Sequence, residues 1–472
     1  MSLSDSKRSV LWSGIQQASI SGINFLITIV IARLLTPDDY GLIAMLSIFF
    51  AFSQAFIDSG LTSALIQKEK CTKEDCNTVF LFSIGISVLF YLVFFFGAPL
   101  IADLYHEPLL VTLTRVYSVN IIIHAIGNVA ITLLQRNLDF KYIAQISLFA
   151  SVSSGIIAIA MAYSGMAYWA LVSQYLISTF ITTTLYLYKT RWVPSMSFSG
   201  DSFKTMINYG IPIMLSSIVN SVYDNIYSLL IGSKYSAEGL GYYNRAYSMS
   251  SFLPFNLSNF SMRALFPIFS RMQGDKNLLV AKILDTIHLS LFVIIPIDTF
   301  LILFSDEIIM VLLTEKWLSM SHIFKILCIA NISYLITNLH TNIFKATGAT
   351  KKLFYSDLMK RIIGVLIVSI TMWYGVNAMV YGILLYSVIA IIIGSIFIKK
   401  VLPLTLLSQL RESFTPLISS LLACIPCILL QSCVSNLYML LFGSSLIFGC
   451  VFILMQKLLN DRGVAFFLHY IK

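Results

Sequence analysis

The sequence predicts an all-α integral membrane protein with about 14 transmembrane helices. Three observations predict this fold class. Hydrophobic residues make up 58% of the 472 residues and charged residues only 11%, whereas about a quarter of a soluble globular domain is charged. Apolar segments of about 20 residues, long enough to cross a bilayer as a helix, recur along the chain with short polar breaks. Basic residues gather in alternate breaks.

The apolar segments have lengths typical of membrane-spanning helices, and we expect fourteen of them. They cover residues 9–34, 39–66, 77–102, 109–135, 140–163, 167–189, 203–232, 237–270, 278–304, 318–345, 352–374, 377–399, 412–431 and 436–457. The stretch 305–319 is the longest outer connection, and we expect a short interfacial turn in it.

The distribution of Lys and Arg predicts which way the chain enters the membrane. If the N-terminus lies in the cytoplasm, 24 of the 31 basic residues fall at the cytoplasmic ends of the predicted helices. This asymmetry is the positive-inside pattern of membrane proteins. We therefore predict an even number of helices and two cytoplasmic termini.

An internal repeat predicts two lobes. The break before the second helix, in the segment from Ala32 to Met45, and the break before the eighth, in the segment from Ile231 to Tyr247, each hold a short acidic turn, an aromatic residue and a glycine that open the next helix. Two repeats of six helices enter the membrane from the same side, so a pseudo-twofold axis along the membrane normal would relate them. We predict an N-lobe over residues 1–190, a cytoplasmic linker over 191–202, a C-lobe over 203–400 and two further C-terminal helices within 401–472.

Composition and spacing exclude several other classes. The net charge of +9 is spread over the loops, and no basic domain with interleaved aromatic residues predicts nucleic-acid binding. Seven cysteines are scattered without a disulfide or zinc pattern. His124, His288 and His340 lack the spacing of metal ligands, and we expect them to be hydrogen-bonded helix residues. We predict no metal and no cofactor.

Four predicted helices carry polar stripes, found by placing residues 100° apart around a helix. The stripes of helices 1, 2 and 7 contain Gln17, Asn24, Ser47, Gln54, Asp58, Asn220 and Asp224. Such residues often join neighbouring membrane helices by hydrogen bonds, which is the simpler interpretation of any one stripe. Because the stripes occupy matching helices of both repeats and carry ionisable groups, we expect them to line a hydrated cavity between the lobes.

The eighth helix carries the strongest signal. Arg245 and Arg263 are 18 residues apart, which is five helical turns, so they share one face about 27 Å apart. Tyr242, Asn256 and Asn259 lie on the same face. A charge at the centre of a membrane costs at least ~2.5 kcal/mol and tends to face water or a partner. Arginine binds phosphate through two parallel hydrogen bonds and keeps its charge, so the pair suits a diphosphate.

The acidic residues on these stripes have two interpretations. Asp58 and Asp224 lie well inside their helices, where they could pair with the cavity arginines as structural ion pairs or bind substrate or a coupling ion. Both remain open at this point.

Several motifs of the chain resemble a known family. The turn Ala32-Arg-Leu-Leu-Thr-Pro-Asp-Asp-Tyr-Gly41 and the segment from Asp58 to Gln67 are similar to the N-terminal signature of Wzx-type polysaccharide flippases. The segments from Gly241 to Tyr247 and from Arg263 to Arg271 resemble that family as well. The resemblance extends over nearly the whole chain and is closest to colanic and teichuronic acid exporters.

The resemblance implies a function and a fold. Members belong to the multidrug, oligosaccharidyl-lipid and polysaccharide exporter superfamily, with two six-helix lobes and a cavity lined by helices 1, 2, 7 and 8. They move undecaprenyl-diphosphate-linked oligosaccharides across the bacterial inner membrane by alternating access. Arg245 and Arg263 would then contact the diphosphate, with Asp58 and Asp224 tuning the cavity. A polysaccharide polymerase and glycosyltransferases are candidate partners, and H⁺ or Na⁺ coupling stays open.

Two other functions compete with this one. A cation-coupled multidrug exporter of the same fold would favour a carboxylate-rich cavity over an arginine-lined one. A membrane glycosyltransferase or polymerase needs a sizeable outer loop or an accessible acidic pair, and the predicted outer loops are too short for either. We therefore predict a transporter and no enzyme. A channel or scaffold has no feature in its favour beyond the simpler interpretation of the stripes.

Overall fold

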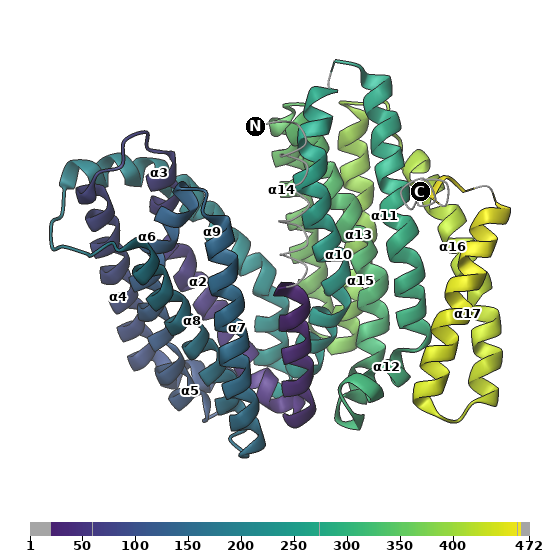
Figure 1. Cartoon of the computed structure of the whole chain (residues 1–472), viewed down its shortest axis with the longest axis horizontal. Coiled ribbons are helices and arrows are strands. Elements are labelled where there is room, and N and C mark those ends of the chain that lie inside the picture. Colours follow the sequence, from purple (N-terminus) through teal and green to yellow (C-terminus); the bar gives the residue numbers. More distant parts are fainter. Residues whose placement is uncertain (1–19, 59, 273, 460, 464–472) are drawn as a thin grey trace. The chain divides into compact units, whose positions relative to one another are not determined.

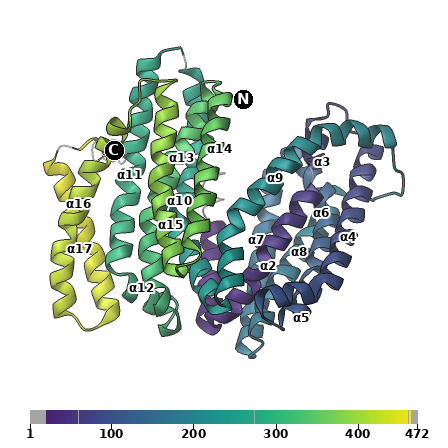
Figure 2. The ribbon, with the colours of Figure 1, turned by 180° about the vertical axis from the view of Figure 1, so that it is seen from behind.

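A computed structural model describes residues 20–58, 60–272, 274–459 and 461–463, with the side chains of residues 259–264 and 266–268 excepted. Every regular element in these ranges is a helix. The chain divides into two compact units, residues 1–244 and 245–472, which meet inside the helix Ala237–Arg271. Figures 1 and 2 show both from opposite sides.

The first unit contains ten helical elements within the described residues. They are the helix Ile20–Leu34, α2 (Pro37–Asp58), α3 (Leu61–Gln67), α4 (Lys73–Tyr105), α5 (Leu110–Tyr117), α6 (Val119–Arg136), α7 (Phe140–Tyr163), α8 (Tyr168–Thr190), α9 (Gly200–Lys234) and the first part of α10 (Ala237–Arg271). α2 packs against α9, and α8 packs against both α6 and α7.

The second unit contains the rest of α10 and eight further helical elements. They are α11 (Lys276–Leu303), α12 (Ser305–Leu312), the 3₁₀ helix Glu315–Met320, α13 (Ser321–Ala346), α14 (Thr350–Thr371), α15 (Val376–Lys399), α16 (Leu406–Cys433) and α17 (Leu437–Leu458). α13 lies between α11 and α15, and α16 packs against α11 and α17 (Figures 1 and 2).

Each of the fourteen predicted segments corresponds to helix in the described residues, with ends shifted by a few residues and two of the segments interrupted. Ten of them are long and apolar enough to cross a membrane; Ile20–Leu34, α9, α10 and α14 are not among these ten. The chain is therefore a multi-pass membrane protein, while the full count of 14 spans stays a prediction. The turn expected at 305–319 is confirmed as α12 and the 3₁₀ helix Glu315–Met320.

Two predicted helices are interrupted, and in one of them a backbone contact explains why. The predicted helix 39–66 breaks before α3 at Gly60, whose φ of 67° is a left-handed value that glycine adopts without strain. A Cβ there would lie 2.4 Å from the carbonyl oxygen of Gly210 in α9. The predicted helix 109–135 divides at Ser118 into α5 and α6. A hydropathy pattern does not predict such breaks, because the apolar residues continue on both sides of them.

The two repeated helix starts pack against each other inside the first unit. A Cβ on Gly41 of α2 would lie 1.8 Å from the carbonyl oxygen of Ala237, the first residue of α10. A Cβ on Gly241 of α10 would lie 1.9 Å from the carbonyl oxygen of Pro37, the first residue of α2. Each helix thus places its fifth residue against the first residue of the other, the reciprocal pattern of a twofold contact. Only glycine permits so close an approach.

The predicted linker is attached to the start of α4 by hydrogen bonds. Residues 191–199 are not helical. The Asn77 amide donates to the hydroxyls of Ser195 and Ser197 at 2.6 and 2.8 Å. Asp75, which is fully buried, accepts from Ser202 at 2.6 Å and from the Lys68 ammonium at 2.7 Å. These bonds fix the entry into α9.

The units divide the chain at a different place from the predicted lobes. The predicted C-lobe begins at residue 203, whereas the first compact unit extends through α9 to Asn244. α9 packs against α2, α3 and α4, all of which precede the linker. Packing and internal repeats are different criteria for dividing a chain. The predicted division into two lobes of six helices and two further helices therefore stays a prediction.

A buried ionic cluster joins α16 and the segment after α17 to α11. His288 of α11 lies 2.7 Å from the Asp461 carboxylate and 3.2 Å from the Glu412 carboxylate. Burial alone would raise the pKa of Asp461, but hydrogen bonds from His288, Thr415 and the Gly463 backbone hold it below its ordinary value. His288 is therefore hydrogen-bonded as predicted, and so is His340, whose Nε2 lies 2.7 Å from the Gln409 amide oxygen.

Candidate functional site

The polar stripe of α2 contains one residue that joins two helices and two residues that are not fully buried. The Ser47 hydroxyl donates to the Asn225 amide oxygen of α9 at 3.3 Å, so it serves as interhelical glue. Gln54 is half-buried, and Asp58 is exposed at the last residue of α2. Along the preceding helix Asn24 is exposed, while Gln17 lies outside the described residues.

On α9, a serine beside the predicted stripe joins helices. The Ser221 hydroxyl donates to the carbonyl of Ala51 at 3.4 Å and joins α9 to α2. Of the stripe itself, Asn220 is half-buried and Asp224 is exposed. The two stripe carboxylates of the first unit, Asp58 and Asp224, are therefore both exposed. The role of Asn225 was not predicted, because the spacing of polar residues alone cannot show which one faces a neighbour.

α10 is one continuous helix from Ala237 to Arg271, so the predicted five-turn interval between its two arginines holds for the backbone. The Tyr242 hydroxyl donates to the Glu238 carboxylate at 2.9 Å. Asn256 donates to the carbonyl of Phe252 at 2.7 Å, a bond within its own helix. The side chains of Asn259 and Arg263 lie outside the described residues.

Arg245 is a buried arginine in the second unit. Its side chain is 5% exposed, and its guanidinium carbon lies 5.9 Å from the ring centroid of Trp317. Trp317 is fully buried and belongs to the 3₁₀ helix Glu315–Met320. A guanidinium over an indole face gains from the ring quadrupole when water is excluded. The sequence places this tryptophan 72 positions away from Arg245, and nothing in the local pattern predicts the contact.

The repeat explains why Arg245 is unusual. Arg245 is the ninth residue of α10, and the ninth residue of α2 is Met45. Met45 is 1% exposed. The same register thus buries an apolar residue in one repeat and an arginine in the other. A buried charge costs several kcal/mol more than a well-packed methionine would, so packing alone gives no reason for arginine at this position.

The arrangement of helices is shared with solved multi-pass membrane proteins. The structure is similar to the lipid II flippase MurJ in an inward closed conformation, with a TM-score of 0.76 and 15% identity over 98% of this chain and all of that one. An inward-facing multidrug transporter of the MATE family matches with a TM-score of 0.62 and 16% identity, over 85% of this chain and 98% of its own.

Sequence comparison shows the family. Residues 30–322 match the family described as polysaccharide biosynthesis protein, and the chain belongs to it. It is 27% identical to the teichuronic acid biosynthesis protein TuaB of Bacillus subtilis, over 73% of this chain and 72% of that protein. It is 23% identical to the lipopolysaccharide biosynthesis protein WzxC of Escherichia coli, over 69% of this chain and 67% of that protein. The predicted resemblance to polysaccharide flippases is confirmed.

Proposed function

We propose that this protein is a flippase that moves undecaprenyl-diphosphate-linked oligosaccharide repeat units across the bacterial inner membrane for surface polysaccharide synthesis. Family membership and the names of the relatives, which include the succinoglycan biosynthesis transport protein ExoT of Rhizobium meliloti at 24% identity, support the substrate class. The similarity in fold to the lipid II flippase MurJ supports the mechanism, since that neighbour is itself a flippase. Transport would proceed by alternating access, with both termini in the cytoplasm.

The observation that carries this proposal is the buried arginine in α10. Arg245 occupies a position that the other repeat fills with Met45. In this conformation its guanidinium packs against Trp317. We assign its contact with the diphosphate to a conformation in which that packing opens, and the contact of Arg263 to the same helix face. Arginine suits this role because its planar donors bind phosphate oxygens in pairs.

The exposed carboxylates have a second role in the proposal. Asp58 and Asp224 lie on helices that pack directly against each other. Carboxylates would repel an anionic diphosphate, so we assign them to sugar hydroxyls or to an H⁺ or Na⁺ coupling ion rather than to the phosphate. Asn24, Gln54, Asn220, Tyr242, Asn256 and Asn259, with Gln17, complete the proposed polar surface for the sugars.

The protein acts in this proposal as a transporter and catalyses no covalent step. Glycosyltransferases would supply its substrate on one face of the membrane, and a polymerase would consume it on the other. The multidrug exporter remains the second candidate, because the MATE transporter shares the fold.

The experiment replaces each arginine in a strain that lacks the native gene and depends on the variant for surface polysaccharide. Arg245→Met and Arg263→Met should lower polymer output about 10–100-fold, the loss expected when one charged hydrogen-bonding group is removed. Lipid-linked repeat units should accumulate in the inner leaflet. The matched control is Arg271→Met, which removes an exposed arginine from the last turn of the same helix.

Immunoblots of membrane fractions show whether each variant is present at the normal level. Arg245→Lys should give an intermediate output, because lysine keeps the charge but loses the paired hydrogen bonds. Normal polymer from both methionine variants would refute the assignment of the site. Normal polymer in the deletion strain, together with increased drug sensitivity, would favour the multidrug exporter instead.

A further inference from the structure

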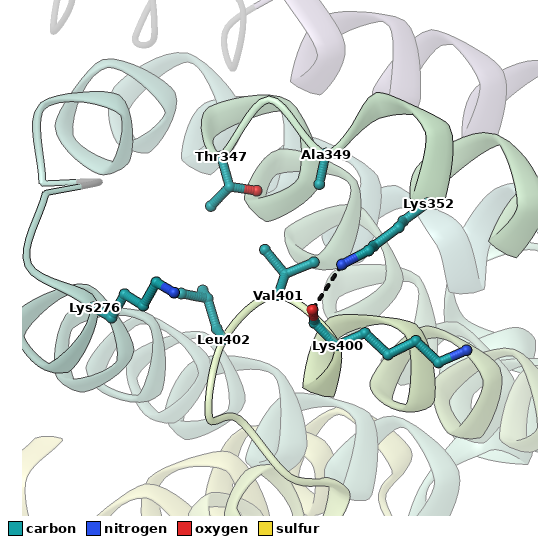
Figure 3. A pocket seen from close by; sticks show the side chains of 7 residues that line it. All are labelled: Lys276, Thr347, Ala349, Lys352, Lys400, Val401 and Leu402. Carbon is teal, nitrogen blue, oxygen red and sulfur yellow. Dashed lines mark hydrogen bonds between the residues drawn. The ribbon is translucent and has the colours of Figure 1, made fainter.

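A hollow with a volume of about 400 Å³ lies at one end of the second unit. It is lined by seven residues from α11, the α13–α14 turn, α14 and the segment after α15: Lys276, Thr347, Ala349, Lys352, Lys400, Val401 and Leu402. Figure 3 shows Lys276 on one side of it and Lys352 on the other, where the Lys352 ammonium meets the Lys400 carbonyl oxygen and the Lys400 side chain extends away from the hollow. Three of the seven lining residues are lysines and none is acidic.

The rim of the hollow is held in place by the chain itself. The Lys352 ammonium donates to the carbonyl oxygen of Lys400 at 2.7 Å, which joins α14 to the end of α15 (Figure 3). The Lys400 ammonium lies 4.9 Å above the Phe397 ring. Leu402 is 3% exposed and belongs to a buried apolar cluster with Leu404 and Ile398. The hollow thus has a cationic rim and an apolar floor.

The positive charge of this rim is not matched by carboxylates. None of the ion pairs among the described residues involves Lys276, Lys352 or Lys400. The neighbouring Asp275 caps α11, where it accepts from the backbone amides of Asn277 and Leu278 at 3.0 and 3.1 Å. Three lysines around one hollow with no acidic lining residue give it a positive potential, which favours an anionic ligand with several oxygens.

Exposed aromatic and apolar residues follow the hollow along α14. Phe354 and Tyr355, one turn after the start of α14, are 63% and 59% exposed, and Leu358 on the next turn is also exposed. Aromatic side chains at the end of a membrane helix mark the interface between headgroups and acyl chains. Positive-inside counting assigns this end of the helices to the cytoplasm, where the leaflet carries anionic lipid.

We propose that this hollow binds the phosphate group of an anionic phospholipid, with Lys276 and Lys352 contacting the headgroup and the exposed Lys400 side chain turning toward it. The lipid's glycerol and acyl chains would continue along the exposed apolar side of α14. The site is independent of the proposed transport function, and its ligand is a structural lipid rather than the transported one. A bound lipid would tie together α11, α14 and α15 at their ends and stabilise the second unit.

The test titrates purified protein in mixed micelles with phosphatidylglycerol and follows thermal unfolding by tryptophan fluorescence. Phosphatidylglycerol should raise the melting temperature, and phosphatidylcholine at the same mole fraction should not. The triple variant Lys276→Gln, Lys352→Gln and Lys400→Gln should shift the half-saturating mole fraction upward by about fivefold for each lysine removed. The double variant Lys276→Gln and Lys400→Gln keeps the bond from Lys352 to the carbonyl of residue 400 and separates lipid binding from misfolding.

A matched control removes the same number of charges from the same helix ends. Lys345→Gln, Lys351→Gln and Lys399→Gln alter exposed lysines that do not line the hollow. They should leave the phosphatidylglycerol response nearly unchanged. An equal loss in this control would show that only the general positive charge matters and would overturn the site. Stabilisation by inorganic phosphate or pyrophosphate alone, equal to that by the lipid, would overturn the assignment to a phospholipid.

Discussion

The starts of α2 and α10 are two copies of one structural repeat, and equivalent residues are 200 positions apart. Thr36 and Ser236 both cap their helices, since their hydroxyls accept from the backbone amides of Asp39 and Gly239. Gly41 and Gly241 both permit a backbone contact with the other helix. The versions differ at the ninth position, where α2 has Met45 and α10 has Arg245.

This comparison separates what the repeat needs for folding from what one copy adds. Both copies keep the residues that build the contact, which are the cap and the glycine. The buried ninth position tolerates two chemistries, and only one of them carries a charge. A charge that packing does not require is a candidate for function, as buried ionisable groups in membrane helices generally are.

The largest effect should come from filling the reciprocal contact. Gly41→Ala and Gly241→Ala each place a Cβ less than 2 Å from a backbone carbonyl oxygen, so the helices must separate at a cost of about 3 kcal/mol or more. We expect both variants to lose most of the folded protein, measured by size-exclusion chromatography after membrane extraction. The control is Gly85→Ala in α4, where a Cβ meets nothing within 4 Å.

The double glycine variant sharpens this prediction. Because both substitutions open one interface, their effects should be clearly less than additive. Additive losses, or normal folding of either single variant, would mean that the two helix starts are not packed reciprocally.

An exchange at the ninth position should have a smaller and asymmetric effect. Met45→Arg buries a charge that this repeat has no means to accommodate, at a cost of about 3 kcal/mol. Arg245→Met should change stability by only about 1 kcal/mol, because methionine adapts to irregular packing and already fills the equivalent position in α2. Thermal unfolding of both purified variants measures the difference. Equal destabilisation would show that Arg245 is needed for packing.

The smallest expected effect is a difference in stability cost between removal of the α2 cap and removal of the α10 cap. In α2, Asp39 also accepts from the Thr36 backbone amide at 2.9 Å, so the cap is reciprocal. In α10 the corresponding residue is Gly239, which has no side chain to return the bond. We expect Thr36→Ala to cost about 1–2 kcal/mol and Ser236→Ala about 0.5–1 kcal/mol. Urea or thermal unfolding checks the order, and a larger cost at Ser236 would contradict it.

Sequence reasoning was most successful for single helices and least for the contacts between them. The segment predicted at 140–163 is α7 over the same residues, because a continuous apolar run between polar breaks has only one compact solution in lipid. The position of Gly60 was missed, since the break depends on the approach of Gly210 from another helix. For the site, hydrogen bonding of Ser47 to Asn225 shows that part of a polar stripe only joins helices.

By itself, the sequence determined the membrane class, the helical segments and the repeated acidic turn and glycine, because each depends on local composition and backbone chemistry. Only the tertiary structure decided which side chains meet. Arg245 faces Trp317, and Lys276, Lys352 and Lys400 gather around one hollow, although long stretches of chain separate them. Periodicity predicts the face of a helix on which a residue lies, but the neighbour that covers this face depends on how the helices pack.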